Sequence, residues 1–238
     1  FVMQVDDAVG RITASLESSG LADDTLVIFT SDNGCSPVAK YPELLAKGHD
    51  PSAGYRGTKA DIFEGGHRVP FIARWPKKVE PGTVSDQLLC LTDLFATCAE
   101  IVGASLADTA AEDSVSFLPT LLAIGGGTPR ASIVHHSING SFAIREGTWK
   151  LILCPDSGGW SDPKPGSAEA KGLPPIQLYD LSKDYVERRN VQAEHPEIVA
   201  RLTRRIERLV ADGRSTPGAP QRNDGPPIVL FKQRAAAP

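Results

Sequence analysis

The stretch TLVIFTSDNG, residues 25–34, sets the fold class of this chain. Its apolar run from Leu26 to Phe29 is typical of a strand buried on both faces, as in a parallel sheet covered by helices. Upstream, apolar residues recur at steps of three and four from Val2 to Leu16, which predicts an amphipathic helix ending near Gly20. Because helix, short turn and buried strand alternate in α/β proteins, we expect a sheet flanked by helices.

The organisation of the chain changes after residue 128. Before it, residues 33–60 predict a long loop, 69–75 a second strand, and 93–102 a helix with Phe95 and Val102 turned inward. After it, short strands are expected at 131–136, 141–145, 148–153 and 176–180, followed by a helix from Pro196. We therefore divide the chain into an α/β unit at 1–128, a small antiparallel sheet plus helix at 129–212, and an extended tail at 213–238.

Composition excludes several classes of protein. With 41% hydrophobic and 23% charged residues, the chain has the balance of a globular protein and not of a disordered one. The net charge of −4 argues against a general nucleic-acid-binding protein, and no apolar run approaches the roughly 18 residues of a membrane span. The chain opens with Phe1 next to the periodic helix, so we interpret it as a fragment cut at or within that helix.

Asp32, Asn33 and Gly34 stand where the buried strand ends. Ligand sites in open α/β sheets gather at the carboxyl ends of strands, and carboxylate and amide oxygens suit Ca²⁺ or Mg²⁺. Asp-Asn-Gly is also a good turn, so a metal site and a plain turn both stay open. A second metal candidate, His135 with His136, is set aside because neighbours on a strand point to opposite faces.

The stretch YRGTKADIFEGGHRVP, residues 55–70, places two cations in a segment broken by glycine. Arg56 and Lys59 lie three residues apart, among backbone amides that a side chain does not cover. Such a group suits a tetrahedral oxyanion, for example sulfate or phosphate. The alternative is a pair of solvent-facing charges, which the spacing alone favours.

Taken in order, these stretches resemble the second half of the type I sulfatases, the arylsulfatase-like members of the alkaline phosphatase superfamily. The matching residues are LVIFTSDNG (26–34), RGTK (56–59), EGGHRVPFIARWP (64–76), QLYDLSKD (177–184) and ERRN (187–190). The resemblance implies part of an alkaline-phosphatase-like mixed sheet flanked by helices, followed by a small antiparallel α+β C-terminal subdomain. Residues 1–128 would then be the C-terminal part of the catalytic domain.

The resemblance also implies roles for the matched positions. Asp32 and Asn33 match two ligands of one Ca²⁺ ion, and Lys59 matches a catalytic lysine that holds a sulfate oxygen. His49 lies in the loop above the expected site, where it would contact the substrate or simply stand exposed. A further matched set belongs to the motif framework and is not interpreted as catalytic: Arg56, Glu64, Gly65 and Gly66.

The nucleophile of the family is a formylglycine made from the first residue of a C/S-x-P-x-R motif. Cys35-Ser-Pro-Val-Ala39 copies three positions of this motif but has Ala39 in place of the arginine, and it lies outside the N-terminal half. We therefore expect the formylglycine, together with the paired aspartates and the assisting histidines, in an N-terminal half that residues 1–238 do not include.

The activity that the resemblance implies is hydrolysis of a sulfuric ester, the sulfate ester of a sugar or an aryl alcohol. A phosphodiesterase or phosphonate hydrolase of the same superfamily is an alternative, because a phosphoryl group can use the same metal and lysine. A non-catalytic module that retained the fold is an alternative of another class. The family implies a periplasmic or secreted location, and without the nucleophile we expect this polypeptide alone to be inactive.

Overall fold

The stretch at residues 25–34 forms half of a two-stranded ribbon. The computed structural model describes residues 1–123 and 129–231. In it, β1 (Val27–Thr30) pairs antiparallel with β2 (Phe71–Arg74), in register from Val27 opposite Arg74 to Thr30 opposite Phe71. The positions of both strands agree with the prediction. The expected parallel sheet and the burial of β1 on both faces do not hold, because the described partner of β1 runs antiparallel to it. Each of its four residues is only partly buried.

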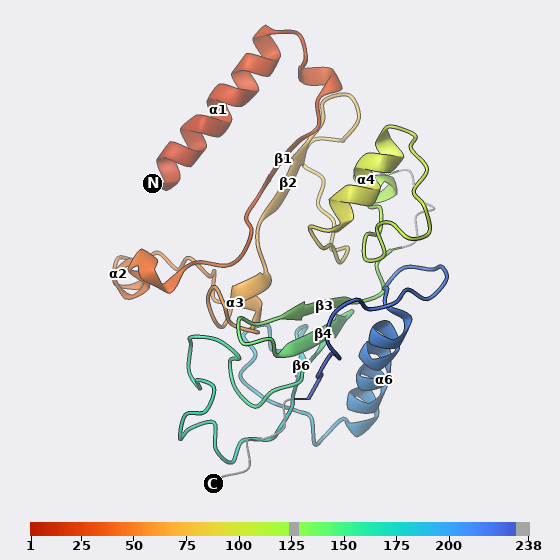
Figure 1. Cartoon of the computed structure of the whole chain (residues 1–238). Helices are drawn as coiled ribbons and strands as arrows, with labels where there is room; N and C mark the ends of the chain where they lie inside the picture. Colours follow the sequence, from red (N-terminus) through yellow and green to blue (C-terminus); the bar gives the residue numbers. More distant parts are fainter. Residues whose placement is uncertain (124–128, 232–238) are drawn as a thin grey trace.

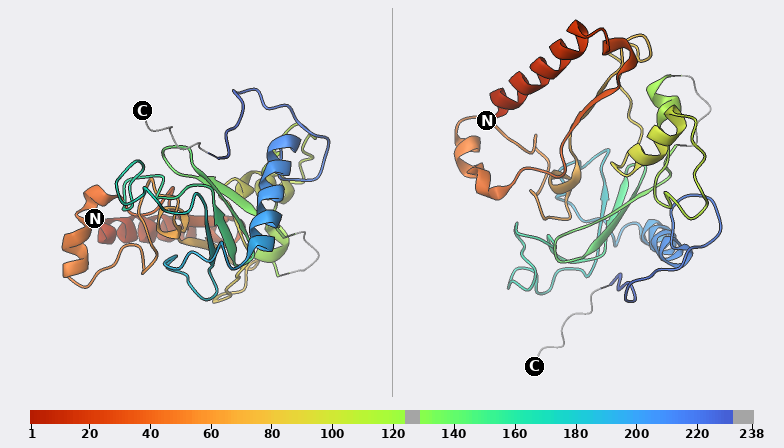
Figure 2. Two further views of the ribbon diagram at one scale, coloured as in Figure 1. Left: turned by 90° about the horizontal axis from the view of Figure 1, so that it is seen from below. Right: turned by 45° about the horizontal axis from the view of Figure 1, so that its top comes forward.

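The helix α1 (Val2–Ser18) leads into the ribbon through a short 3₁₀ turn, η1 (Ala22–Asp24). Its predicted end is confirmed, since Gly20 follows with a φ of +68°, which glycine adopts without strain. No residue of α1 is buried, and Ile12 of its apolar stripe is exposed. Figures 1 and 2 show α1 and the ribbon projecting away from the second sheet. Among the described residues, the apolar side of α1 therefore lacks cover.

Short helices occupy the connections of the first part of the chain. They are η2 (Pro37–Ala39), α2 (Tyr41–Ala46), α3 (Glu64–His67), α4 (Asp93–Ile101) and α5 (Leu118–Leu121). Asp93 anchors α4, because its buried carboxylate accepts the N–H of Val115 at 2.8 Å and pairs with Arg130. The prediction that Phe95 and Val102 face inward is wrong, since both are exposed. Leu94 and Ile101, which the same pattern predicts to face inward, are partly buried, and the polar contacts of Asp93 add to the attachment of this helix.

The second sheet supplies the main core. It consists of β3 (Ile133–His136), β4 (Phe142–Glu146), β5 (Trp149–Ile152) and β6 (Gln177–Asp180), hydrogen-bonded in that order. Every adjacent pair is antiparallel, as the predicted hairpins require, with Ile133 opposite Arg145, Ala143 opposite Ile152 and Trp149 opposite Asp180. The connection between β4 and β5 turns at Gly147, whose φ is +58°.

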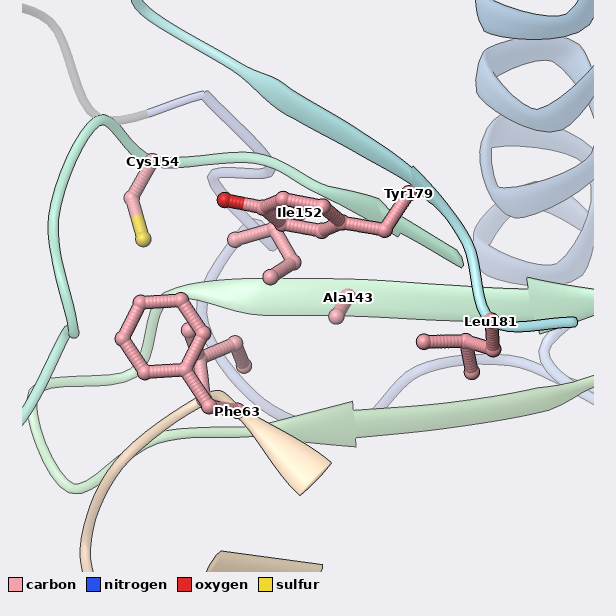
Figure 3. Packing of buried hydrophobic residues seen from close by; sticks show 7 residues of the cluster. Phe63, Ala143, Ile152, Cys154, Tyr179 and Leu181 are labelled. Carbon is pink, nitrogen blue, oxygen red and sulfur yellow. The ribbon is translucent and has the colours of Figure 1, made fainter. Parts of the chain in front are cut away.

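The two faces of this sheet pack against different parts of the chain. On one face lies α6 (Pro196–Asp212), whose Leu202 and Ile206 are fully buried (Figure 2). On the other face Ile62 and Phe63, from the loop before α3, join a cluster with Ala143, Ile152 and Tyr179 of the sheet (Figure 3). The long loop of the first part is thereby built into the core of the second.

A fully buried ammonium joins this loop to the sheet. Lys150 of β5 has no exposed surface, and its Nζ lies 3.0 Å from Glu64 Oε1 and 2.8 Å from Glu187 Oε1. Burial alone would raise the pKa of Glu64, but Lys150 and Arg145 together hold it below its ordinary value. Burial raises the pKa of Glu187, because Lys150 offsets only part of the desolvation. The charges are thus paired where no water reaches them.

Residues after α6 return to the first part of the chain. Arg214 is buried and its Nη1 donates to Asp108 Oδ1 at 3.0 Å, while the N–H of Ser215 donates to the carbonyl of Glu112 at 3.1 Å. The end of the predicted first unit at residue 128, and the last residues of the tail, 232–238, lie outside the described residues. In the described part of the chain, no helix is both long and apolar enough to cross a membrane.

Replacement of the buried lysine tests whether this ion network supports the fold. Lys150→Met should lower the free energy of unfolding by about 3–5 kcal/mol, because it leaves two buried carboxylates without their shared cation. Urea unfolding followed by tryptophan fluorescence measures the loss. Lys183→Met is the matched control, since Lys183 pairs with Asp180 on the surface and its loss should cost less than about 1 kcal/mol. Equal losses in the two variants would contradict the assigned role of Lys150.

Candidate functional site

Two backbone hydrogen bonds bring the predicted metal and sulfate segments together. The N–H of Gly34 donates to the carbonyl of Gly66 at 3.0 Å, and the N–H of Lys59 donates to the carbonyl of Cys35 at 2.9 Å. The segment after β1 therefore crosses directly over the loop that carries Lys59. Asp32 and Asn33 stand on one side of this crossing, next in sequence to Gly34.

Glycine is required at the crossing because the two backbones almost touch. A Cβ added at Gly34 would lie 1.7 Å from the carbonyl oxygen of Gly65. A Cβ at Gly65 would lie 2.3 Å from the carbonyl oxygen of Gly57, and one at Gly66 would lie 2.4 Å from that of Asp61. No other residue type fits at these three positions without moving the backbone.

Asp32 and Asn33 present oxygen atoms of the kind that calcium prefers. Asp32 is exposed, and the Ser31 hydroxyl lies 3.4 Å from its Oδ1. The Nδ2 of Asn33 donates to the carbonyl of Gly34 at 3.0 Å, so the amide oxygen is left as the group that can ligate a cation. Calcium takes six to eight oxygen ligands, so these two fit one part of its coordination shell. Among the described residues, no group of three or more His, Cys, Asp or Glu could hold a metal ion.

The side chains of the three predicted residues do not all face one cavity. Asp32 lines a cavity of about 1560 Å³, together with Glu64, His67, Arg68 and Arg145, and neither Asn33 nor Lys59 is part of its lining. The structure therefore joins Asp32 and Asn33 to Lys59 through the crossing of their backbones. His49 lies on the exposed loop after α2, where its N–H donates to the carbonyl of Leu44 at 2.9 Å, and its contact with substrate stays a prediction.

Two framework residues, Arg56 and Glu64, hold the loop that carries Lys59 at both of its ends. We call residues 56–64 the lysine loop. Arg56 Nη1 donates to the carbonyl of Glu187 at 2.7 Å, and its guanidinium lies 3.7 Å from the centre of the Phe63 ring. At the other end, the N–H of Glu64 donates to Glu187 Oε2 at 2.6 Å. These contacts fix the backbone around Lys59 and leave Arg56 and Glu64 engaged with protein groups, in agreement with a framework role.

Cys35 has the environment of an unreactive thiol. It is partly buried and its Sγ lies 3.6 Å from the carbonyl of Ser36. Burial, together with the negative charge of Asp50, raises the pKa of Cys35 above its ordinary value. A thiol that stays protonated at neutral pH is a poor nucleophile, which agrees with the missing arginine at position 39.

A pair of histidine rings in contact beside the Asp32 cavity was not expected from the sequence. The ring centres of His67 and His135 lie 4.3 Å apart with their planes at 46°, and the buried Nε2 of each has no hydrogen-bond partner among the described residues. Burial, with the positive charge of Lys150, lowers the pKa of His67 to about 4, and it lowers the pKa of His135 well below its ordinary value. Both imidazoles are therefore neutral at pH 7. The alternation along β3 places His135 inward, but nothing in the sequence pairs it with His67.

The family and the relatives that this chain resembles are all sulfatases. The family described as Sulfatase matches residues 1–104. An N-acetylgalactosamine-6-O-sulfatase of Bacteroides thetaiotaomicron is 38% identical over 212 residues, which cover 87% of this chain and 40% of that protein. Human arylsulfatase A is 34% identical over 217 residues, which cover 84% of this chain and 41% of the relative. The chain thus spans about two fifths of the length of the curated relatives it matches.

Solved structures support the fold. A structure from work on glycosaminoglycan metabolism by Bacteroides thetaiotaomicron superimposes with a TM-score of 0.74 at 38% identity, covering 87% of this chain and 43% of that one. A Pseudoalteromonas sulfatase with 24% identity gives a TM-score of 0.67 over 87% of this chain and 41% of that one, which supports the fold alone. The predicted fold class, part of an alkaline-phosphatase-like α/β fold followed by an antiparallel subdomain, is confirmed.

A methyl group at the crossing should separate the two segments. Gly34→Ala should lower the free energy of unfolding by more than about 2 kcal/mol, because its Cβ would overlap a backbone oxygen that cannot rotate away. Gly10→Ala is the matched control, since nothing lies within 4 Å of its added Cβ, and in mid-helix alanine should stabilise by about 0.5–1 kcal/mol. Thermal unfolding followed by circular dichroism compares the two, and an unchanged Gly34→Ala protein would contradict the crossing.

The low pKa of His67 predicts a loss of stability in mild acid. Between pH 6.5 and about 4 the unfolded chain binds a proton at this imidazole that the folded chain excludes, so stability falls as the pH falls. The slope for one such group is about 1.4 kcal/mol per pH unit. Between pH 7 and pH 5, the free energy of unfolding measured with urea should fall by about 2 kcal/mol less in the His67→Phe variant than in the unaltered chain. An identical pH dependence of the two proteins would contradict the assigned pKa.

Proposed function

The chain belongs to the sulfatase family, and on that premise we propose that it forms part of the active site of a sulfuric ester hydrolase. The observation that carries this proposal is the crossing of the segment after β1 over the lysine loop, where Gly34 bonds to Gly66 and Lys59 bonds to Cys35. Asp32 and Asn33, which carry hard oxygen ligands, and Lys59, which carries an ammonium group, therefore stand on two backbone segments that contact each other. Such a set suits an anion bound with a divalent cation.

Asp32 and Asn33 would hold one calcium ion. The ion, when bound, supplies positive charge that offsets the charge of the sulfate group. Since two residues give only part of a calcium shell, the other ligands come from outside residues 1–238. Ser31 and Gly34 orient the exposed carboxylate of Asp32 and the amide group of Asn33 through hydrogen bonds. Because these side chains are already oriented, metal binding would cost less conformational entropy.

Lys59 would bind a non-bridging oxygen of the sulfate. Its backbone is fixed by the bond to Cys35, while its side chain, only partly buried, keeps an ammonium that can donate to the anion. As the sulfur–oxygen bond breaks, negative charge grows on the bridging oxygen of the leaving alcohol, and a cation held on a non-bridging oxygen would offset the charge that stays on the sulfate group. By analogy with other electrostatic stabilisers, the loss of such a group costs about 10²–10³ in rate.

The nucleophile of the proposed reaction lies outside residues 1–238. The Cys35–Ala39 segment lacks the arginine of the modification motif, and the thiol of Cys35 is held protonated. We propose that a formylglycine in a further part of the protein reacts with the sulfate ester of a sugar or an aryl alcohol. The names of two curated relatives, an N-acetylgalactosamine-6-O-sulfatase and an arylsulfatase, support this class of substrate. The resemblance to the family leads us to propose a periplasmic or secreted location as well.

Binding measured residue by residue tests the proposal. In ¹⁵N NMR titrations, CaCl₂ should shift the amides of Asp32 and Asn33, and Na₂SO₄ added next should shift that of Lys59. Asp32→Ala should raise the Kd for calcium about tenfold or more, and Lys59→Ala should do so for sulfate, because each removes the charge opposite its ligand. Lys47→Ala, an exposed lysine of the loop after α2, is the matched control and should change neither. Sulfate binding that survives Lys59→Ala unchanged would overturn the proposal.

The same preparations also test the missing nucleophile. With 4-nitrophenyl sulfate at saturating calcium, the chain should release no more nitrophenol than its Lys59→Ala variant. Hydrolysis above that control would contradict a nucleophile that lies elsewhere.

A further inference from the structure

Two arginine side chains converge on one carboxylate oxygen at the cavity that Asp32 lines. Arg145 Nη1, from β4, lies 3.1 Å from Glu64 Oε2. Arg68 Nη1, from the residue that follows α3, lies 3.7 Å from the same oxygen. Arg68, Arg145 and Glu64 all belong to the lining of this one cavity of about 1560 Å³. Two guanidinium groups from different elements therefore meet at one point of its wall.

Arg68 is oriented by its neighbours, although 48% of its side chain is exposed. Its guanidinium lies 4.8 Å from the centre of the Tyr55 ring, which is within the range of a cation–π contact. Tyr55 in turn contacts Tyr185 edge to face, with the ring centres 5.7 Å apart. The backbone N–H of Arg68 donates to the carbonyl of Glu64 at 2.7 Å. A side chain that is already oriented loses less conformational entropy when it binds a ligand.

Arg145 is fixed by the sheet and by two hydrogen bonds, and it still has a donor to offer. It lies opposite Lys150 of β5, its Nε donates to the carbonyl of Gly147 at 3.1 Å, and its Nη1 donates to Glu64. A guanidinium carries five N–H donors in one plane. Within the described parts of the chain, Arg145 Nη2 and the whole guanidinium of Arg68 donate to no protein acceptor. Both arginines can therefore donate to a further group at this place.

The charges at this point of the cavity do not cancel. The connected ion pairs comprise three cations and two carboxylates, namely Lys150, Arg145, Arg68, Glu64 and Glu187. Among the described residues, the other acids of the cavity lining form no ion pair with either arginine: Asp32, Glu80 and Asp86. His67 and His135, which also line the cavity, are neutral at pH 7, because burial and the charge of Lys150 lower the pKa of both. At least one positive charge is left over.

We propose that Arg68 and Arg145 form a binding site for a sulfate ester group. Such a group is singly charged and has three terminal oxygens that point in different directions. Two guanidinium groups on different elements can each donate to it, whereas a carboxylate has two oxygens in one plane, which a single guanidinium binds. Lys59 is not part of the lining of this cavity, so the site is separate from the one proposed for the reacting sulfate. The inference goes beyond the proposed function and does not depend on it.

Methyl sulfate is the probe for this site, because it carries a sulfate ester and no ring. It is titrated into the full chain without calcium, at an ionic strength kept constant with NaCl, and the arginine Nε–H signals are followed by ¹⁵N NMR. The signals of Arg68 and Arg145 should shift together and give one Kd. Arg68→Gln should raise that Kd, measured at Arg145, about tenfold or more, because it removes one of two charged donors.

Further variants show whether this loss is specific. Arg189→Gln is the matched control, since Arg189 is an exposed arginine that pairs with Glu194 and does not line the cavity. It should leave the Kd within about twofold. Arg68→Lys keeps the charge but not the planar guanidinium, so it should recover only part of the affinity. Arg68→Gln should remain folded in a thermal unfolding scan, because the buried partners of Glu64 stay in place.

Lys59→Ala separates this inference from the proposed function. The shifts of Arg68 and Arg145 should persist in this variant, because Lys59 does not line the cavity. If the arginine signals shift but the amide of Lys59 does not respond to sulfate, the proposed function fails and the arginine site is supported. If the arginine shifts disappear in Lys59→Ala, the arginine site is overturned.

Three other outcomes would also overturn the arginine site. The first is that the signals of Arg68 and Arg145 do not shift, or shift as much with NaCl alone. The second is that Arg189→Gln weakens binding as much as Arg68→Gln, because the effect would then come from the overall charge. The third is that acetate binds as tightly as methyl sulfate, because the site would then be one for a carboxylate.

Discussion

The buried ammonium of Lys150 is the interaction on which the rest of the structure depends. It stands on the second sheet and is shared by Glu64, from the loop that carries Lys59, and Glu187, from the segment after β6. Since buried charges are costly without partners, the loop and the sheet are bound to one relative position. Figure 1 shows α3, which begins at Glu64, lying beside this sheet. The geometry of the lysine loop thus depends on Lys150 and Glu187, which lie 86 and 123 positions after Glu64.

From that fixed loop, hydrogen bonds extend in two directions. Toward the first part of the chain, three glycines allow the segment after β1 to cross over it, which places Asp32 and Asn33 near Lys59. Toward the second part, the carboxylate of Asp61 holds the loop of Trp160. Both contacts use backbone groups, so they set the path of the chain and leave side chains available for a ligand. Two side chains of the same loop, Ile62 and Phe63, are part of the hydrophobic core next to the second sheet.

The first part of the chain is less complete than the second. The β1–β2 ribbon is only partly buried, the apolar side of α1 is uncovered among the described residues, and Asp32 lines a large open cavity. The second sheet, in contrast, has α6 on one face and the lysine loop on the other. This difference agrees with the coverage of the relatives, since the chain spans about two fifths of their length.

The sequence by itself determined the positions of the strands along the chain, the C-terminal end of α1, the antiparallel nature of the second part and the family. These follow from local patterns, because periodicity, turn residues and short motifs act over a few neighbouring positions. It also singled out Asp32, Asn33 and Lys59, through motifs that resemble a known family. Only the tertiary structure decided that β1 stays half exposed, that the ring of His67 contacts that of His135, and that Asp61 joins Thr58 to Trp160. Each of these depends on contacts between residues that are tens of positions apart, and no local pattern encodes which distant surfaces will meet.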